Sequence, residues 1–70
     1  MDLNNPQVAV DEMANMMSTL DAMMNFLKTS EDVQAVMGDV LWKKTIENCA
    51  EAKGCLAENK AVTESFIPQA

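Results

Sequence analysis

Methionine is the most frequent residue in this sequence whose side chain could do chemistry, with seven copies among 70 residues. Five of them share one stretch: Met13, Met16, Met17, Met23 and Met24. Thioethers are ligands for a soft ion such as Cu(I). These five recur at helical spacing, however, which packing in a core explains completely. We therefore predict neither a metal site nor a cofactor.

The two cysteines and the paired acids also favour structural roles. If Cys49 and Cys55 share one helix, their α-carbons are roughly 9 Å apart, which is beyond disulfide reach. Cys49 lies on an apolar arc and is predicted to be buried, whereas Cys55 is nearer the edge of that arc and more exposed. Glu47 and Glu51 are four residues apart on a polar arc, typical of a solvated face. With no histidine, no general base for catalysis is evident, and we predict that the chain is not an enzyme.

The charge balance disfavours contact with phosphates. Eleven acids oppose five lysines, and the formal net charge is -6. Lys43 and Lys44, beside Trp42, form the one local basic pair, which is too small to outweigh the acids. The second residue, Asp2, is an acid where a secretory signal would carry positive charge, and the longest apolar runs are only three or four residues. We therefore predict a cytoplasmic protein without a secretory signal or membrane span.

The elements that must position these residues are helices. Asn5 and Pro6 form a strong helix start, and no glycine or proline follows until Gly38. We predict a helix over residues 6–28. Its apolar residues recur at spacings of three and four, with two more on one flank, and form a broad stripe, here named the methionine stripe. The stripe comprises Val10, Met13, Met16, Met17, Leu20, Met23, Met24 and Leu27.

A second helix is predicted over residues 31–37, with Thr29 as a hydroxyl cap and Asp32 in capping-box-like spacing. A third is predicted over residues 39–66, continuous through Gly54, before a frayed tail at 67–70. The apolar phase shifts at Gly38, where we predict a break with Asp39 capping the next helix. At 100° per residue, one cluster lies on one side of the helix: Val33, Val36, Met37 and Val40. The other lies on nearly the opposite side: Leu41, Trp42, Thr45, Cys49, Ala52, Leu56 and Phe66.

The predicted fold is an all-α antiparallel helical hairpin, a single domain over residues 1–70, that dimerises into a helical bundle. A two-helix chain of this size buries too little surface to be stable alone, and it has no metal or disulfide framework to compensate. The methionine stripe is predicted to mediate self-association.

The residues around the break are the candidates for binding a partner, and we name them the elbow cluster. They are Val33, Val36, Met37, Val40, Leu41 and Trp42. A buried aromatic with a polar tip often dominates an interface, although packing in the hairpin explains Trp42 as well.

The predicted function is therefore non-catalytic protein binding by a homodimer, as an adaptor, inhibitor or regulator of a larger protein. Small acidic helical proteins of this kind are common in mobile elements such as phages. A co-chaperone that covers a helix of a secreted or assembling protein is one alternative, and a nucleic-acid-binding hairpin dimer is another.

Overall fold

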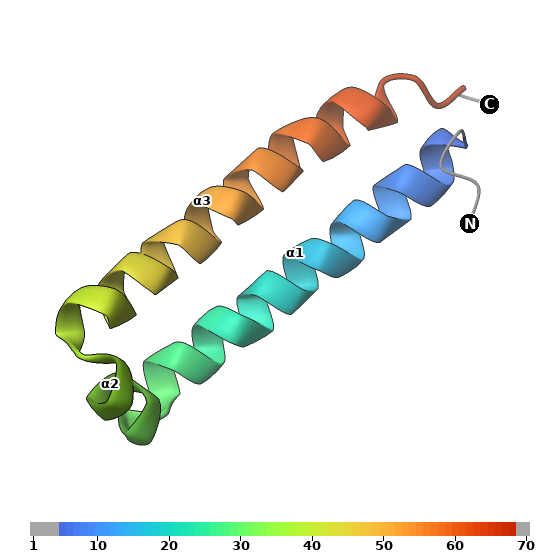
Figure 1. The fold of residues 1–70 in the computed structure, drawn as a ribbon. Coiled ribbons are helices and arrows are strands. Elements are labelled where there is room, and N and C mark those ends of the chain that lie inside the picture. Colours follow the sequence, from blue (N-terminus) through green and yellow to red (C-terminus); the bar gives the residue numbers. More distant parts are fainter. Residues whose placement is uncertain (1–4, 69–70) are drawn as a thin grey trace.

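A computed structural model describes residues 5–68 of the chain. Its three helices are α1 (Pro6–Thr29), α2 (Glu31–Met37) and α3 (Asp39–Glu64). Helices α1 and α3 run antiparallel side by side, and α2 closes one end (Figure 1). The molecule measures 50 × 18 × 18 Å. The predicted all-α hairpin is confirmed.

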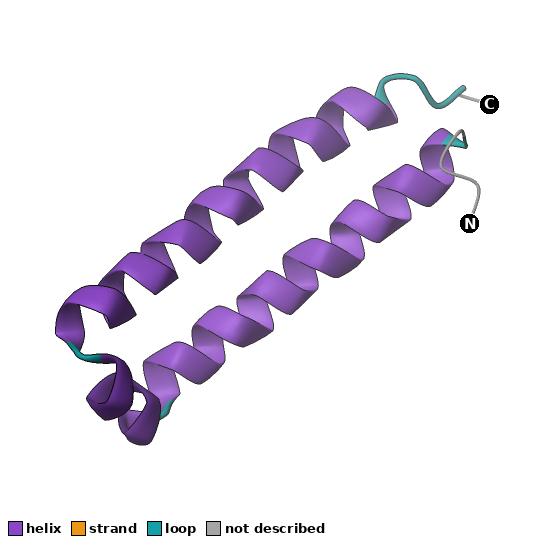
Figure 2. Cartoon of the chain, in the orientation of Figure 1, coloured by secondary structure: helices purple, strands orange, loops and turns teal. Residues whose placement is uncertain are grey.

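The helix ends lie close to the predicted ones. Helix α1 ends at Thr29, one residue later than predicted, and α3 ends at Glu64, two residues earlier. Helix α3 passes through Gly54 without a break, as predicted. The predicted tail begins outside the helix at Ile67 and Pro68, while residues 69–70 lie outside the described part (Figure 2).

The first bend is capped differently from the prediction. Ser30, not Thr29, is the N-cap of α2, and its hydroxyl accepts a hydrogen bond from the Val33 amide at 3.4 Å. Thr29 is the last residue of α1, and its hydroxyl donates to the Asn25 carbonyl at 2.8 Å. A single residue therefore serves as the C-cap of one helix and the N-cap of the next, which forces a sharp bend.

The second bend lies at Gly38, as predicted. Its φ of 82° and ψ of 155° fall in a region that essentially only glycine adopts. Asp39 is not the cap that we predicted: it already lies in α3, and its carboxylate accepts a hydrogen bond from the Gln34 side chain at 3.2 Å. The bend therefore depends on the backbone of Gly38.

The two glycines should respond in opposite ways to alanine. Gly38→Ala places a side chain at a positive φ and should destabilise the fold by about 1–3 kcal/mol, although an added Cβ would have nothing within 4 Å. Gly54→Ala, in an exposed and equally open part of α3, should stabilise it by about 1 kcal/mol. Urea unfolding followed by circular dichroism checks both, and equal effects of the same sign would contradict this account.

Trp42 ties the beginning of α3 to the end of α1. Its indole Nε1 donates a hydrogen bond to the Leu27 carbonyl oxygen at 2.6 Å. The last carbonyls of a helix have no partner within that helix, so a side chain from α3 satisfies one of them. Leu27 is itself buried, with 8% of its surface exposed. Trp42 therefore has the structural role that was the alternative to partner binding: it packs within the hairpin.

The hairpin core is thin. Only Val10, Leu27 and Cys49 are buried within the described residues, and none of their side chains is completely enclosed. On α1 the residues that face α3 are the six at alternating spacings of three and four. They are Val10, Met13, Met17, Leu20, Met24 and Leu27, all buried or half-buried. Two helices alone therefore leave much apolar surface exposed.

Candidate interaction surface

Helix α3 carries two stripes at heptad spacing, and they differ in burial. The first faces α1, and all its members are buried or half-buried: Trp42, Ile46, Cys49, Lys53, Leu56, Lys60 and Thr63. The second stripe lies one residue earlier at each step, which turns it about 100° around the helix. Its members, the last of which lies in the turn that follows the helix, are Leu41, Thr45, Asn48, Ala52, Cys55, Asn59, Val62 and Phe66. All of these except Thr45 are exposed.

Helix α1 repeats this arrangement. One residue before each member of its core-facing stripe lies a second stripe: Ala9, Glu12, Met16, Thr19, Met23 and Phe26. Because the two helices are antiparallel and face each other, the same rotation brings both second stripes to the same side of the hairpin. We name these two stripes together the side face.

The large exposed apolar side chains concentrate on the side face. Its members include Met16, Met23, Phe26, Leu41, Val62 and Phe66, between 47% and 70% exposed. The one charged residue of its two stripes is Glu12. The side face is thus the apolar side of an otherwise acidic hairpin.

The opposite side of the hairpin is small and polar. On α1 it carries Asp11, Ala14, Ser18, Asp21, Asn25 and Lys28; on α3 it carries Lys43, Glu47, Ala50, Gly54, Ala57, Ala61 and Glu64. An ion pair joins the helices there, with Lys53 Nζ 2.7 Å from a carboxylate oxygen of Asp21. The two long sides of the molecule are therefore chemically distinct.

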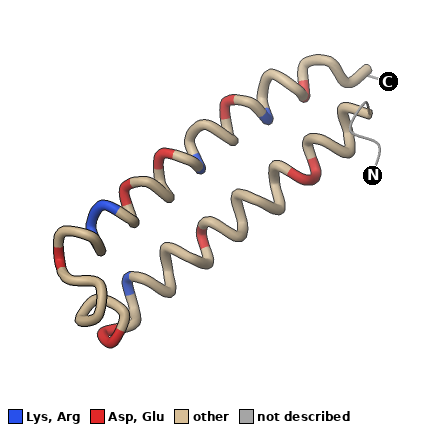
Figure 3. Tube along the Cα trace, viewed as in Figure 1, with Lys and Arg blue, Asp and Glu red and all other residues tan. Residues whose placement is uncertain are grey.

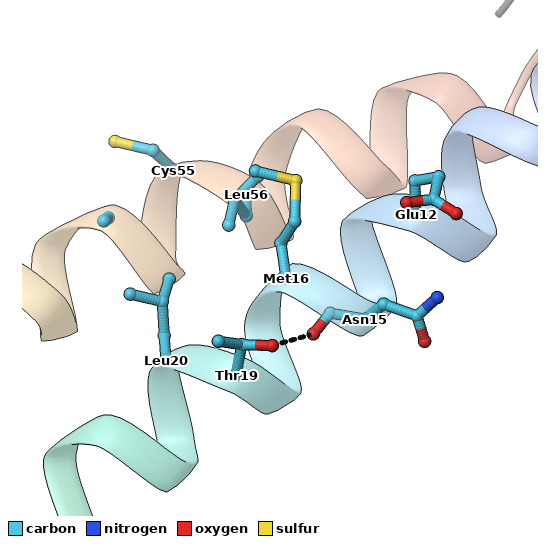
Figure 4. A pocket seen from close by; sticks show the side chains of 8 residues that line it. Glu12, Asn15, Met16, Thr19, Leu20, Cys55 and Leu56 are labelled. Carbon is cyan, nitrogen blue, oxygen red and sulfur yellow. Dashed lines mark hydrogen bonds between the residues drawn. The ribbon is translucent and has the colours of Figure 1, made fainter. Parts of the chain in front are cut away.

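An apolar groove of about 630 Å³ opens in the middle of the side face (Figure 4). Its lining comes from both helices: Glu12, Asn15, Met16, Thr19, Leu20, Ala52, Cys55 and Leu56. Met16 extends toward Leu56, while the Cys55 thiol points away along the rim (Figure 4). The Thr19 hydroxyl donates to the Asn15 carbonyl at 3.0 Å. Because the groove is open and apolar, it is suited to receiving side chains.

The structure divides the methionine stripe. Six of its eight residues pack toward α3 inside the hairpin, whereas Met16 and Met23 project from the side face. Glu12, Asn15 and Thr19 lie outside the predicted stripe, but all three line the groove. The surface that remains free for another molecule is thus narrower than the predicted stripe and lies on the side face of the hairpin.

The elbow cluster is also divided. Val36 and Val40 are 87% and 86% exposed, and Leu41 is 55% exposed. Val33, Met37 and Trp42 are half-buried at the two bends. The structure thus leaves two valines almost fully accessible at the closed end of the hairpin (Figure 1).

The predicted apolar cluster between Leu41 and Phe66 on the third helix is split by the same geometry. Trp42, Thr45, Cys49 and Leu56 are buried or half-buried, whereas Leu41, Ala52 and Phe66 are exposed. The whole arc was predicted to form one face. Ile46 and Lys53 were not among its predicted members, although both are half-buried. An offset of one residue separates the buried stripe from the exposed one.

The described residues contain no other candidate centre. Within residues 5–68 no three acids, cysteines or histidines lie close enough to hold a metal ion. Cys49 is buried and Cys55 is exposed, and both are free thiols. Lys43 and Lys44 are exposed, and acids alternate with the lysines along α3 (Figure 3). None of the described helices is long and apolar enough to cross a membrane.

Comparison with known proteins adds no assignment. No protein-family model matches this chain, and neither a curated protein nor a solved structure is similar to it.

Proposed function

We propose that this chain is a small, non-catalytic protein-binding factor that acts as a homodimer, as an adaptor, inhibitor or regulator of a larger protein. The observation that supports the proposal best is the amount of apolar surface that a single hairpin leaves uncovered. Among residues 5–68, eight large apolar residues are between 47% and 87% exposed, while three residues are buried. Contiguous exposed apolar surface marks sites of interaction.

Two separate surfaces are available for two kinds of contact. The side face runs the length of the hairpin and is suited to another long helical surface. Val36 lies in α2 and Val40 in the first turn of α3, both at the closed end of the hairpin, and both are almost fully exposed. We assign the two most exposed residues of the elbow cluster, Val36 and Val40, to the larger protein, and the side face, which includes Leu41, to self-association.

A co-chaperone is the second candidate, favoured by the groove. Its apolar lining could receive the apolar face of a client helix. In that case the chain alone would be a monomer, and the client helix would bind a side face that no second copy covers. The nucleic-acid alternative depends on Lys43 and Lys44, which acids surround along α3 (Figure 3).

The elbow contact is tested by substituting the two exposed valines. Val36→Glu with Val40→Glu should leave helicity unchanged, because both side chains are almost fully solvated. In an affinity capture from nuclease-treated host lysate, one host protein should be recovered with the wild-type chain in near-stoichiometric amount. Its recovery should fall at least tenfold with the double variant.

The matched control adds the same two carboxylates elsewhere. Ala22 and Ala61 are exposed and lie away from the elbow and the side face, so Ala22→Glu with Ala61→Glu should retain the captured protein. Equal recovery by both variants would contradict the elbow assignment. The nucleic-acid alternative would be supported instead if a protein were captured only from lysate without nuclease treatment, and if Lys43→Glu with Lys44→Glu prevented that capture.

A further inference from the structure

We propose that a second copy of this chain covers the side face in an antiparallel arrangement, with α3 packed on α3 and α1 packed on α1 of the second copy. The inference rests on the proposed homodimer and adds its face, orientation and register. In this arrangement Asn48 of each copy lies opposite Asn59 of the other.

The exposed area is the first argument for a second copy. The chain exposes 5151 Å². A globular monomer of its mass exposes about 4300 Å². The excess, roughly 850 Å², reflects the elongated shape of the molecule, which measures 50 × 18 × 18 Å. It is close to the ~800 Å² that one partner contributes to a standard protein interface. A copy of equal length can cover the whole side face at once.

The order of residues along α3 is the second argument. An antiparallel pair places residues opposite one another when they are equally distant from the two-fold axis. With that axis between Lys53 and Gly54, every member of the second α3 stripe meets another member. The pairs are Leu41 with Phe66, Thr45 with Val62, Asn48 with Asn59, and Ala52 with Cys55.

These pairs are matched in chemistry as well as in position. Two large apolar residues meet at the ends, two β-branched side chains of similar size meet inside them, and small residues meet at the centre, where the helices can approach closely. Asn48 and Asn59 are the two amides of the stripe, and they meet each other. Paired asparagines at otherwise apolar positions specify register and orientation in packed helices.

The same axis suits α1. The Asp21–Lys53 ion pair sets the middle of α3 level with residue 21 of α1. The midpoint between Met16 and Met23 lies within about 2–3 Å of that level, at 1.5 Å of rise per residue. Each exposed methionine therefore meets the other methionine of the second copy across the axis.

The parallel arrangement loses this matching. It would place α1 of one copy on α3 of the other at the same level. Phe26 and Asn48 each lie five residues from the ion pair and would then face each other. Met16 lies five residues from it and Asn59 six, so these two would be neighbours. Both amides would lie against large apolar side chains without a hydrogen-bonding partner, which is unfavourable once water is excluded.

Disulfide capture tests the face and the register together. Two variants are made in a Cys55→Ser background, one with Asn48→Cys and one with Asn59→Cys. They are unfolded together, refolded as a mixture and mildly oxidised. The mixture should give a covalent dimer on a non-reducing gel in at least tenfold greater yield than either variant alone, because residues 48 and 48, or 59 and 59, lie far apart in this register.

The opposite side of the hairpin supplies the matched control. Ala50 and Ala57 are exposed and are also symmetric about the middle of α3, so the mixture of Ala50→Cys with Ala57→Cys should give no covalent dimer. A dimeric mass by light scattering without the 48–59 disulfide would overturn this inference and leave the proposed function standing. A monomeric mass at 100 μM wild-type chain would overturn both this inference and the homodimer, while the elbow variants would still test partner binding separately.

Discussion

Replacing Trp42 with alanine should unfold the hairpin. The substitution removes the largest side chain at the junction of α1 and α3, together with the hydrogen bond to the Leu27 carbonyl. Truncating a large aromatic residue in a packed site costs about 3–5 kcal/mol. Small domains have total stabilities of only about 5–15 kcal/mol, and this thin core places the chain at the low end. Far-ultraviolet circular dichroism at 25 °C should show most of the helical signal lost.

Trp42→Phe separates the hydrogen bond from the packing. Phenylalanine keeps most of the apolar contact but has no N–H, so the Leu27 carbonyl loses its donor. The expected loss is about 1 kcal/mol, visible as a lower urea midpoint with the helical signal retained. A Trp42→Ala variant as stable as wild type would show that the indole does not hold the helices together.

The second large effect concerns the inward half of the methionine stripe. Met17 and Leu20 are half-buried against α3. Changing both to aspartate removes apolar contacts worth at least about 2 kcal/mol each in a packed site and adds two carboxylates that lose hydration. We expect loss of helicity at every protein concentration, measured by circular dichroism between 1 and 200 μM.

Met16→Asp with Met23→Asp is the matched control on the same helix. These methionines are about half exposed on the side face. Their substitution should lower the affinity of self-association at least tenfold and make unfolding occur on dilution, because the side face rather than the hairpin core is altered. Identical concentration dependence of the two double variants would show that the stripe is not divided between two neighbours.

The sequence was sufficient to predict the elements, because helix signals are local. The start at Asn5 and Pro6, the break at Gly38 and the spacing of apolar residues each depend on a few neighbouring positions. The division of burial was harder to predict. Met16 and Met17 are adjacent and chemically identical, and only the position of α3 makes one exposed and the other half-buried.

Long-range polar contacts were also beyond the sequence pattern. No pairing of Lys53 with Asp21 was predicted, yet Lys53 is half-buried on the stripe that faces α1 and its charge reaches Asp21. The hydrogen bond from Trp42 to Leu27 joins residues 15 positions apart. Such contacts depend on how two helices are set against each other, and a periodic pattern in either helix contains no information about that setting.

The hydrogen bond from Trp42 to the end of α1 also has a consequence for the order of folding. Closing the chain at this contact fixes a segment of 15 residues, whereas closing it at the Asp21–Lys53 ion pair fixes one of 32. The entropic cost of loop closure is greater for the longer segment by about 0.7 kcal/mol. An isolated helix is marginal in water, so α1 and α3 gain stability mainly where they already touch. We therefore expect the contacts between the two helices to form first at the elbow and then progressively toward the open end.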